Sequence, residues 1–189
     1  SASTNLVTTI AGSGSSRFTG DGGSAVAAKL SYPIGVALHS DKLFIADKFN
    51  NRIRQVDLTT GIITTIAGGG FSQQENSPAL DFMLSFPIHL VADHDGNLII
   101  VTDGKVYRLD KATNFITTFA GSGLQGFSGD NGPAPLARML WLAAAAFDSN
   151  GNLFISDGGN NRIRKVAARI QQTITFNALP AVTVGDSPI

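Results

Sequence analysis

The chain has 189 residues, with 14 basic and 14 acidic side chains, 21 glycines, no cysteine and 43% hydrophobic residues. Because the formal net charge is zero, there is no overall positive field to attract nucleic acid or anionic lipid, and we expect neither as a partner. The longest apolar run, Met139 to Phe147, is far shorter than the roughly 20 residues of a membrane span. Without cysteine, disulfides, thiolate metal sites and cysteine nucleophiles are excluded. The composition predicts a turn-rich domain with one sizeable core.

The sequence repeats itself, with three landmarks recurring in step. They are Thr8-Thr-Ile-Ala-Gly12, which returns at Thr64 to Gly68 and, with Phe for Ile, at Thr117 to Gly121; Leu43, which returns as Leu98 and Leu153; and Asn50-Asn-Arg-Ile-Arg54, which returns at Asn160 to Arg164. The leucines lie 55 residues apart. Agreement between separate landmarks indicates a true structural repeat.

Each repeat is predicted to hold four short strands, because apolar and β-branched runs alternate with Gly, Asn, Asp and Pro. In the first repeat these strands are expected near 34–38, 43–46, 52–57 and 62–66. Residues 5–10 are predicted as an orphan fourth strand, whereas the last repeat ends after its third strand at Val166. Short helical turns are expected at Ala25–Leu30 and Ala134–Met139.

Four-stranded antiparallel repeats of this length predict the blades of an all-β fold, the β-propeller. The landmarks, together with Phe18-Thr-Gly-Asp-Gly-Gly23 and Pro33-Ile-Gly-Val36, resemble NHL repeats over residues 6–167. The resemblance implies a six-bladed ring, of which this chain would hold three four-stranded blades at about 6–57, 62–110 and 115–167. Since three blades cannot close a ring, we expect either a fragment of a longer parent or a homodimer that joins three blades to three.

The repeat pattern changes near residue 170, so the sequence predicts a propeller segment at 1–170 and a tail at 171–189. The tail, with Gln172-Thr-Ile-Thr-Phe176 and Gly185-Asp-Ser-Pro188, resembles the opening of a bacterial Ig-like repeat domain. That pairing implies an exported, multidomain bacterial protein, located outside the cell or at its surface.

Two kinds of polar loop are expected on one face, because the loop entering strand one and the loop between strands two and three emerge on the same side of a blade. We predict this loop face as the ligand-binding face, with a protein or a small polar molecule as ligand. Its candidate residues are Asp21, Asp47, Asn51, Arg52, Asp130, Asp157, Asn161 and Arg162.

A structural role for these loops is the alternative, because each Asp can accept hydrogen bonds from its own loop. The second repeat has Thr102 where the other repeats have Asp47 and Asp157, and it also lacks the Asn-Asn-Arg segment. The joint loss of these residues is expected if they form one self-contained, hydrogen-bonded turn. The second arginines of the motif, Arg54 and Arg164, are expected to cover a blade edge with charge.

His89 is the candidate for an axial site, since it stands where the other repeats have Gly35 and Ala144. A metal site needs three or more convergent ligands, so we predict no metal and no other cofactor, although a dimer would bring two copies of His89 toward one channel. No catalytic residue is predicted, because no nucleophile elbow or base beside a serine is found. We expect a non-catalytic binding or scaffolding module; the alternative is a lyase or lactonase with an axial, metal-dependent site.

Five aromatic residues recur at equivalent places of the repeats. Phe18 and Phe127 lie in the glycine-rich loops, and Tyr32, Phe86 and Trp141 stand immediately before the first strand. Periodic aromatics in this fold are expected to wedge between neighbouring blades. No stripe of Lys or Arg accompanies them, so base stacking with RNA is not supported.

Overall fold

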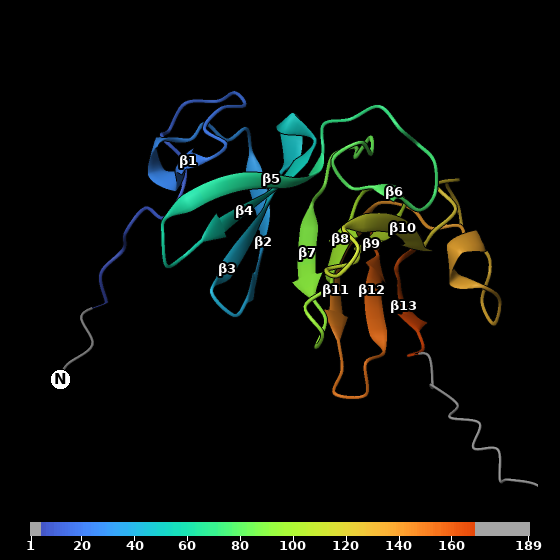
Figure 1. The fold of residues 1–189 in the computed structure, drawn as a ribbon. Helices are drawn as coiled ribbons and strands as arrows, with labels where there is room; N and C mark the ends of the chain where they lie inside the picture. Colours follow the sequence, from blue (N-terminus) through green and yellow to red (C-terminus); the bar gives the residue numbers. More distant parts are fainter. Residues whose placement is uncertain (1–4, 169–189) are drawn as a thin grey trace, which may run out of the picture.

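The computed structural model describes residues 5–168, and the predicted tail at 171–189 lies outside them. Three antiparallel sheets stand side by side, each built from strands that follow one another in the chain (Figure 1). Blade one contains β2 (Pro33–His39), β3 (Lys42–Asp47), β4 (Arg52–Asp57) and β5 (Ile62–Gly68). Blade two contains β7 (His89–Ala92), β8 (Leu98–Val101), β9 (Val106–Leu109) and β10 (Phe115–Ala120). Blade three contains β11 (Leu142–Phe147), β12 (Leu153–Asp157) and β13 (Arg162–Val166).

Two short strands extend the outer edges of the first two blades. β1 (Gly23–Ser24) pairs with β5, and β6 (Ser77–Pro78) pairs with β10. The helical content of residues 5–168 is limited to 3-10 turns of three residues each: η1 (Ala25–Ala27), η2 (Lys48–Asn50), η3 (Ala134–Leu136) and η4 (Gly158–Asn160). η1 and η3 confirm the two predicted helical turns in shorter form. No helix among the described residues could cross a membrane.

The first strand of each blade lies innermost, so that β7 has β2 on one side and β11 on the other. Gly35 of β2 lets two of these strands approach closely, because a Cβ there would lie only 2.6 Å from the Ile88 carbonyl oxygen. The inner strands therefore form a continuous wall that leads from blade one to blade three.

The core consists of the interfaces between blades, because successive side chains of a strand point to opposite faces of its sheet. Blade two packs through Leu98 and Ile100 against Phe44 of blade one, and through Ile99 and Val101 against blade three. All four residues of β8 are buried. Blade two is thus enclosed on both faces, as expected of an interior propeller blade.

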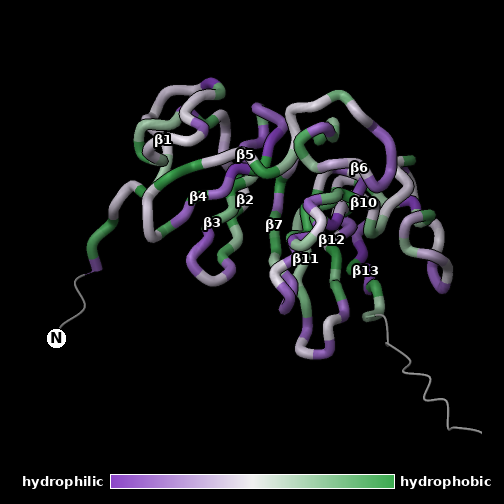
Figure 2. The backbone as a smooth tube through the Cα atoms, viewed as in Figure 1, coloured by the Kyte–Doolittle hydropathy of each residue, from purple (hydrophilic) through white to green (hydrophobic). Residues whose placement is uncertain are grey.

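The outward faces of blades one and three carry uncovered apolar side chains. On blade one, Val36 and Leu38 are 61% and 62% exposed, and Figure 2 shows β2 as largely hydrophobic. On blade three, Ile163 is 69% exposed and Phe154 is 36% exposed. Each of these faces has the composition of a blade interface but has no covering blade among the described residues.

The prediction of a strand at residues 5–10 is wrong for the described chain. These residues form no strand, and Leu6 and Val7 are 78% and 100% exposed. A strand needs a partner edge, and none lies beside this segment. Among residues 5–168, the outer edge of β13 likewise has no pairing strand, so blade three has three strands there.

Candidate functional site

Two kinds of loop meet on one face, as the sequence predicts. The Asn50 side chain donates a 2.8 Å hydrogen bond to the Arg17 carbonyl, which joins the η2 loop to the glycine-rich loop before β1. In blade three, Asn160 donates in the same way to the Gly126 carbonyl at 2.9 Å. The loop face is therefore a pair of repeated, hydrogen-bonded units.

The carboxylate of Asp47 is the buried centre of the first unit. Asp47 is fully buried and accepts hydrogen bonds from the Ser31 backbone amide at 2.6 Å and from the Asn50 side chain at 2.8 Å. Arg54 Nη1 lies 3.5 Å from the same carboxylate. Both oxygens of the carboxylate thus contact groups of the protein itself.

Arg54 connects this centre to the glycine-rich loop, and we call the ion pairs of Arg54 with Asp47 and Asp21 the Arg54 clamp. Arg54 Nη2 donates to Asp21 Oδ1 at 2.8 Å and to the Thr19 carbonyl at 3.2 Å. The guanidinium is fully buried, so the prediction that Arg54 covers a blade edge with charge is wrong. β5 pairs along β4, and the side chain of Arg54 points inward because two carboxylates receive it there.

Blade three repeats the arrangement as the Arg164 clamp. Arg164 lies 3.2 Å from Asp157 and 2.8 Å from Asp130, and it also donates to the Ser128 carbonyl. Arg164 is 8% exposed, so its predicted edge position is wrong too. In blade two, the Thr102 hydroxyl donates to the Lys105 carbonyl at 2.9 Å and closes a shorter turn.

Phe18 and Phe127 lie beneath paired guanidinium groups on the loop face. Phe18 is 3.9 Å from Arg52 Cζ and 4.9 Å from Arg54 Cζ, measured from the ring centroid. Phe127 lies at 3.9 and 5.0 Å from Arg162 and Arg164. The prediction that these two rings wedge between blades is wrong, because cation–π contacts hold them against the clamps.

The other predicted site residues shape the loops. Asn51 and Asn161 have left-handed backbone at φ 54° and end η2 and η4. Arg52 and Arg162 donate to the carbonyls of Asn50 and Asn160. Of the four acidic candidates, Asp21 and Asp130 keep exposed side-chain surface, at 39% and 59%. A ligand-binding role for these residues stays a prediction, and the hydrogen bonds give each of them a structural role.

An exposed aromatic cluster lies beside the Arg54 clamp, and we define it as Tyr32, Lys48, Phe49 and Phe86. Tyr32 stacks on Phe49 with ring centroids 5.0 Å apart, and Phe86 meets Phe49 edge-on at 6.2 Å. Lys48 Nζ lies 5.5 Å from both the Tyr32 and Phe49 rings. The three rings are 59%, 55% and 50% exposed, in the order Tyr32, Phe49, Phe86.

The exposure of the aromatic cluster contradicts the predicted wedge positions of Tyr32 and Phe86, and Trp141 at 64% exposed contradicts its own. All three have left-handed backbone, at φ 53°, 45° and 49°, immediately before the inner strand. The cluster spans blades one and two, which are both present. Phe49 and Phe86 lie where these two blades meet, so a missing neighbour does not explain the exposure of these two rings, whereas Tyr32 lies at the open face of blade one.

Sequence reasoning missed Phe49 and Lys48. Their signal lies in the comparison of the two matching loops, since Gly158 and Gly159 occupy the same places in blade three. The fold does not require Lys48 and Phe49 at these positions, because blade three forms the same turn with two glycines. The first loop therefore differs from its counterpart in blade three, where a Cβ at Gly159 would lie 2.5 Å from Leu140.

His89 of β7 forms a hydrogen bond to the neighbouring inner strand, β11. Its Nδ1 accepts a 3.4 Å hydrogen bond from the Ala145 amide of β11, and burial lowers the pKa of the imidazole. Within residues 5–168, no group of three or more His, Asp or Glu side chains could hold a metal ion. The axial-site hypothesis for His89 stays a prediction.

The lowered pKa of His89 gives an expected pH dependence. Because the folded protein disfavours the protonated ring, stability is fully present above the unfolded pKa of about 6.5 and decreases as the pH falls below it. We expect the free energy of unfolding, measured with urea, to decrease between pH 7 and pH 5. In His89→Gln, which keeps a hydrogen-bond acceptor, this decrease should be smaller; an identical decrease in both proteins would contradict it.

The comparisons with known proteins agree with this geometry. No family model matches the chain. Two crystal structures from Bacteroides match the chain with a TM-score of 0.58. A protein of unknown function from Bacteroides thetaiotaomicron is 19% identical, and the match covers 67% of this chain and 32% of that one. An auxiliary nutrient binding protein from Bacteroides ovatus is 18% identical, and the match covers 76% of this chain and 39% of that one. The fold is a β-propeller.

Sequence relatives support NHL-type repeats in this propeller. NHL repeat-containing protein 2 of Bos taurus is 31% identical over 103 residues, which is 51% of this chain and 14% of that protein. Protein SUPPRESSOR OF QUENCHING 1 of Arabidopsis thaliana is 32% identical over 147 residues, or 71% of this chain and 14% of that protein. The chain thus spans a small part of the curated relatives that it matches.

Proposed function

We propose that this propeller segment is a non-catalytic binding module that holds a partner protein on its loop face through the aromatic cluster. The observation that carries the proposal is the exposure of Tyr32, Phe49 and Phe86 together, at half or more of each side chain. Exposed aromatic groups of this kind are typical of protein-binding surfaces, because they offer a large contact area at a small cost in side-chain entropy.

The chemistry of the cluster favours one kind of partner segment. The stacked rings of Tyr32 and Phe49 offer a surface to an apolar side chain, and Phe86 borders it at nearly a right angle, 89° to Phe49. Lys48 adds a positive charge beside the rings. A segment with an apolar anchor next to a carboxylate would satisfy both groups.

The two sides of the cluster are held by hydrogen bonds within the loop face. Asn51 Oδ1 accepts a 2.9 Å hydrogen bond from the Phe86 amide, so the loop of blade one fixes the aromatic residue of blade two. The Phe49 amide donates to the Ser31 carbonyl at 3.0 Å, beside Tyr32. A preorganised surface of this kind loses little conformational entropy on binding.

The wider setting belongs to the proposal as well. An exported, multidomain bacterial protein and a location outside the cell or at its surface stay predictions. For the alternative, a lyase or lactonase, residues 5–168 offer no cluster of metal ligands at His89 or elsewhere. The exposed aromatic cluster supports the binding module, and a metal-dependent site has no such support among residues 5–168.

Selection from a displayed library of random dodecapeptides tests the binding function. Peptides enriched on the 189-residue chain should bind Tyr32→Ser/Phe49→Ser about 30-fold more weakly, because central aromatic anchors carry about 2 kcal/mol or more of the binding free energy. Phe71→Ser is the matched control, since Phe71 is 92% exposed and lies outside the cluster. Failure to enrich any peptide, or equal affinity for wild type and the double variant, would contradict the proposal.

A further inference from the structure

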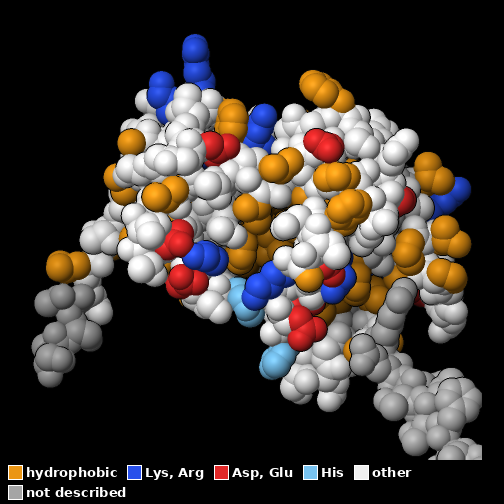
Figure 3. Space-filling view, in the orientation of Figure 1, with side chains coloured by type: hydrophobic (Ala, Val, Ile, Leu, Met, Phe, Trp, Pro, Cys, Tyr) orange, Lys and Arg blue, Asp and Glu red, His pale blue; other side chains and the backbone are white. Residues whose placement is uncertain are grey.

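A cavity of about 330 Å³ lies between blades one and two, at the opposite ends of the strands from the aromatic cluster. The turn between β2 and β3 forms one side of its mouth, and Gly96 of the turn between β7 and β8 forms the other. Figure 3 shows the hollow between the two blades, with hydrophobic side chains inside it and Lys and His side chains at its edge. Its size is at the lower end of the range for small-molecule pockets.

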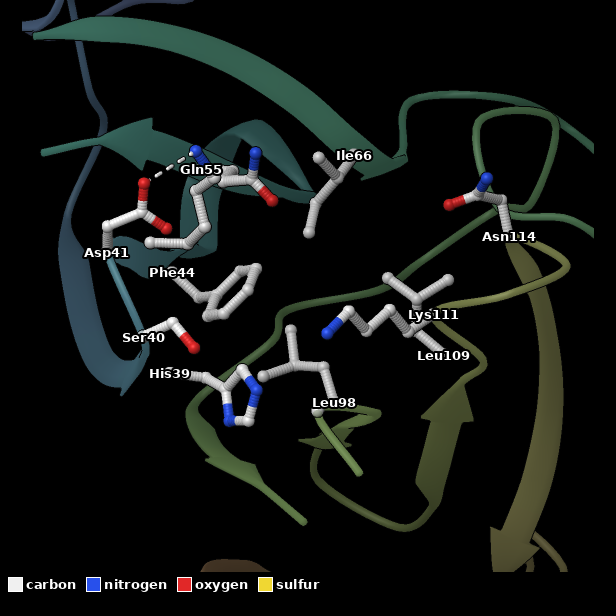
Figure 4. A pocket seen from close by; sticks show the side chains of 12 residues that line it. His39, Ser40, Asp41, Phe44, Gln55, Ile66, Leu98, Leu109, Lys111 and Asn114 are labelled. Carbon is white, nitrogen blue, oxygen red and sulfur yellow. Dashed lines mark hydrogen bonds and ion pairs between the residues drawn. The ribbon is translucent and has the colours of Figure 1, made fainter. Parts of the chain in front are cut away.

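The inner wall of this cavity is apolar. Phe44 of blade one and Leu98 and Leu109 of blade two are 7%, 2% and 6% exposed, and Ile66 of β5 adds a half-buried side chain (Figure 4). These residues belong to the interface between the two blades, so their positions are set by the core. The wall is therefore a rigid surface suited to an apolar group.

Two nitrogen groups converge at the mouth. A Cβ placed on Gly96 would lie 2.7 Å from His39 Nε2 and 3.0 Å from Lys111 Nζ, so both groups approach the same point from different blades. In Figure 4 the Lys111 side chain extends into the cavity toward His39 and Leu98. Gly96 keeps this point open because it has no side chain.

Two lysines, Lys42 and Lys111, line the cavity, and they differ in their partners. Lys42 is occupied, since its ammonium lies 3.3 Å from Asp41 and 2.5 Å from Asp57. Asp41, which also lines the cavity, shares this single ammonium with Asp57, so these three side chains together carry one net negative charge. Among residues 5–168, Lys111 takes part in no ion pair, so its ammonium group can accept a ligand carboxylate above the apolar wall.

We propose that this cavity binds a small carboxylate with an apolar body. The carboxylate lies at the mouth, where Lys111 Nζ gives a charge-assisted hydrogen bond and His39 Nε2 a second polar contact. The apolar body lies against Phe44, Leu98 and Leu109 and removes their remaining surface from water. This site is separate from the loop face and does not depend on the function proposed for it.

Three probes separate the two halves of the site: hexanoate carries both groups, 1-hexanol only the apolar chain, and acetate only the charge. Titration into the 189-residue chain, followed by backbone amide NMR shifts, should show saturable shifts at residues 39–42 and 96–98 for hexanoate. Hexanoate should bind about tenfold more tightly than either 1-hexanol or acetate.

Substitutions locate the binding. Lys111→Gln should weaken hexanoate about tenfold and leave 1-hexanol unchanged, because only the carboxylate contact is lost. Ile66→Trp should remove binding of both by filling the cavity. Lys165→Gln, an equal change of charge at an exposed position of β13, should have no effect. Absence of shifts at the cavity, acetate binding as tightly as hexanoate, or equal hexanoate affinity for wild type and Lys111→Gln would each overturn the proposal.

Discussion

Replacing Arg54 with methionine is expected to lower the free energy of unfolding by about 3–5 kcal/mol. The substitution removes a fully buried guanidinium and leaves the fully buried carboxylate of Asp47 without its charged partner. It also removes the ion pair of Arg54 with Asp21 in the glycine-rich loop. Removing one partner of a buried ion pair lowers the free energy of unfolding by more than the intact pair contributes to it, because the remaining charge is buried and poorly solvated.

Urea unfolding followed by circular dichroism measures this loss, and Arg52→Met is the control. Arg52 also lies over Phe18, but it is only partly buried and pairs with no carboxylate among residues 5–168, so its replacement should cost about 1 kcal/mol or less. Adding Asp47→Asn to Arg54→Met should recover part of the stability by removing the unpaired charge. Equal losses for Arg52→Met and Arg54→Met would show that the clamp does not stabilise the fold in this way.

The 189-residue chain is expected to associate in solution through its two uncovered blade faces. A symmetric pair would place blade three of one copy against blade one of the other, which covers Val36, Leu38, Phe154 and Ile163 in both copies. Light scattering should then give twice the chain mass of 19.7 kDa. This is the expected three-plus-three arrangement of blades.

Val36→Lys/Leu38→Lys should shift the solution mass to that of the single chain, because two ammonium groups would be buried in the contact. Leu124→Lys/Leu136→Lys is the matched control, since these leucines are 58% and 70% exposed but lie in the loop after β10 and in η3, outside the strands of the two open blade faces. A wild-type mass of 19.7 kDa would exclude the dimer. It would leave the fragment of a longer ring as the remaining explanation.

The blades could be predicted from the sequence because their signals are local and repeated. Short runs of apolar and β-branched residues between turn residues, such as Leu43 to Ala46 and the segment before Thr60-Gly61, indicate β3 and β4 without knowledge of any distant contact. The segment 5–10 has the same local pattern as β5, yet it forms no strand among the described residues. Strand formation there depends on a partner edge, which a local pattern does not reveal.

The position of the candidate site could be predicted from the sequence, but the orientation of its side chains could not, because it depends on distant contacts. Loop connectivity was enough to place Asp21 and Asp47 on one face, but the burial of Arg54 depends on carboxylates 33 and 7 residues away in the chain. Periodicity identified Tyr32 and Phe86 as equivalent, but it gave no direction for their rings. Phe49 has no counterpart in the other repeats, so a search for repetition passed over the residue that joins the cluster.

Hydrogen exchange of the chain with and without a selected peptide tests most directly that the loop face is the binding face. We expect slower exchange of the amides near Tyr32, in η2 and near Phe86, because the peptide covers the aromatic cluster that these segments present. The outward faces of blades one and three should exchange as before. Slowing confined to those faces, or to the cavity between blades one and two, would contradict the proposed binding surface.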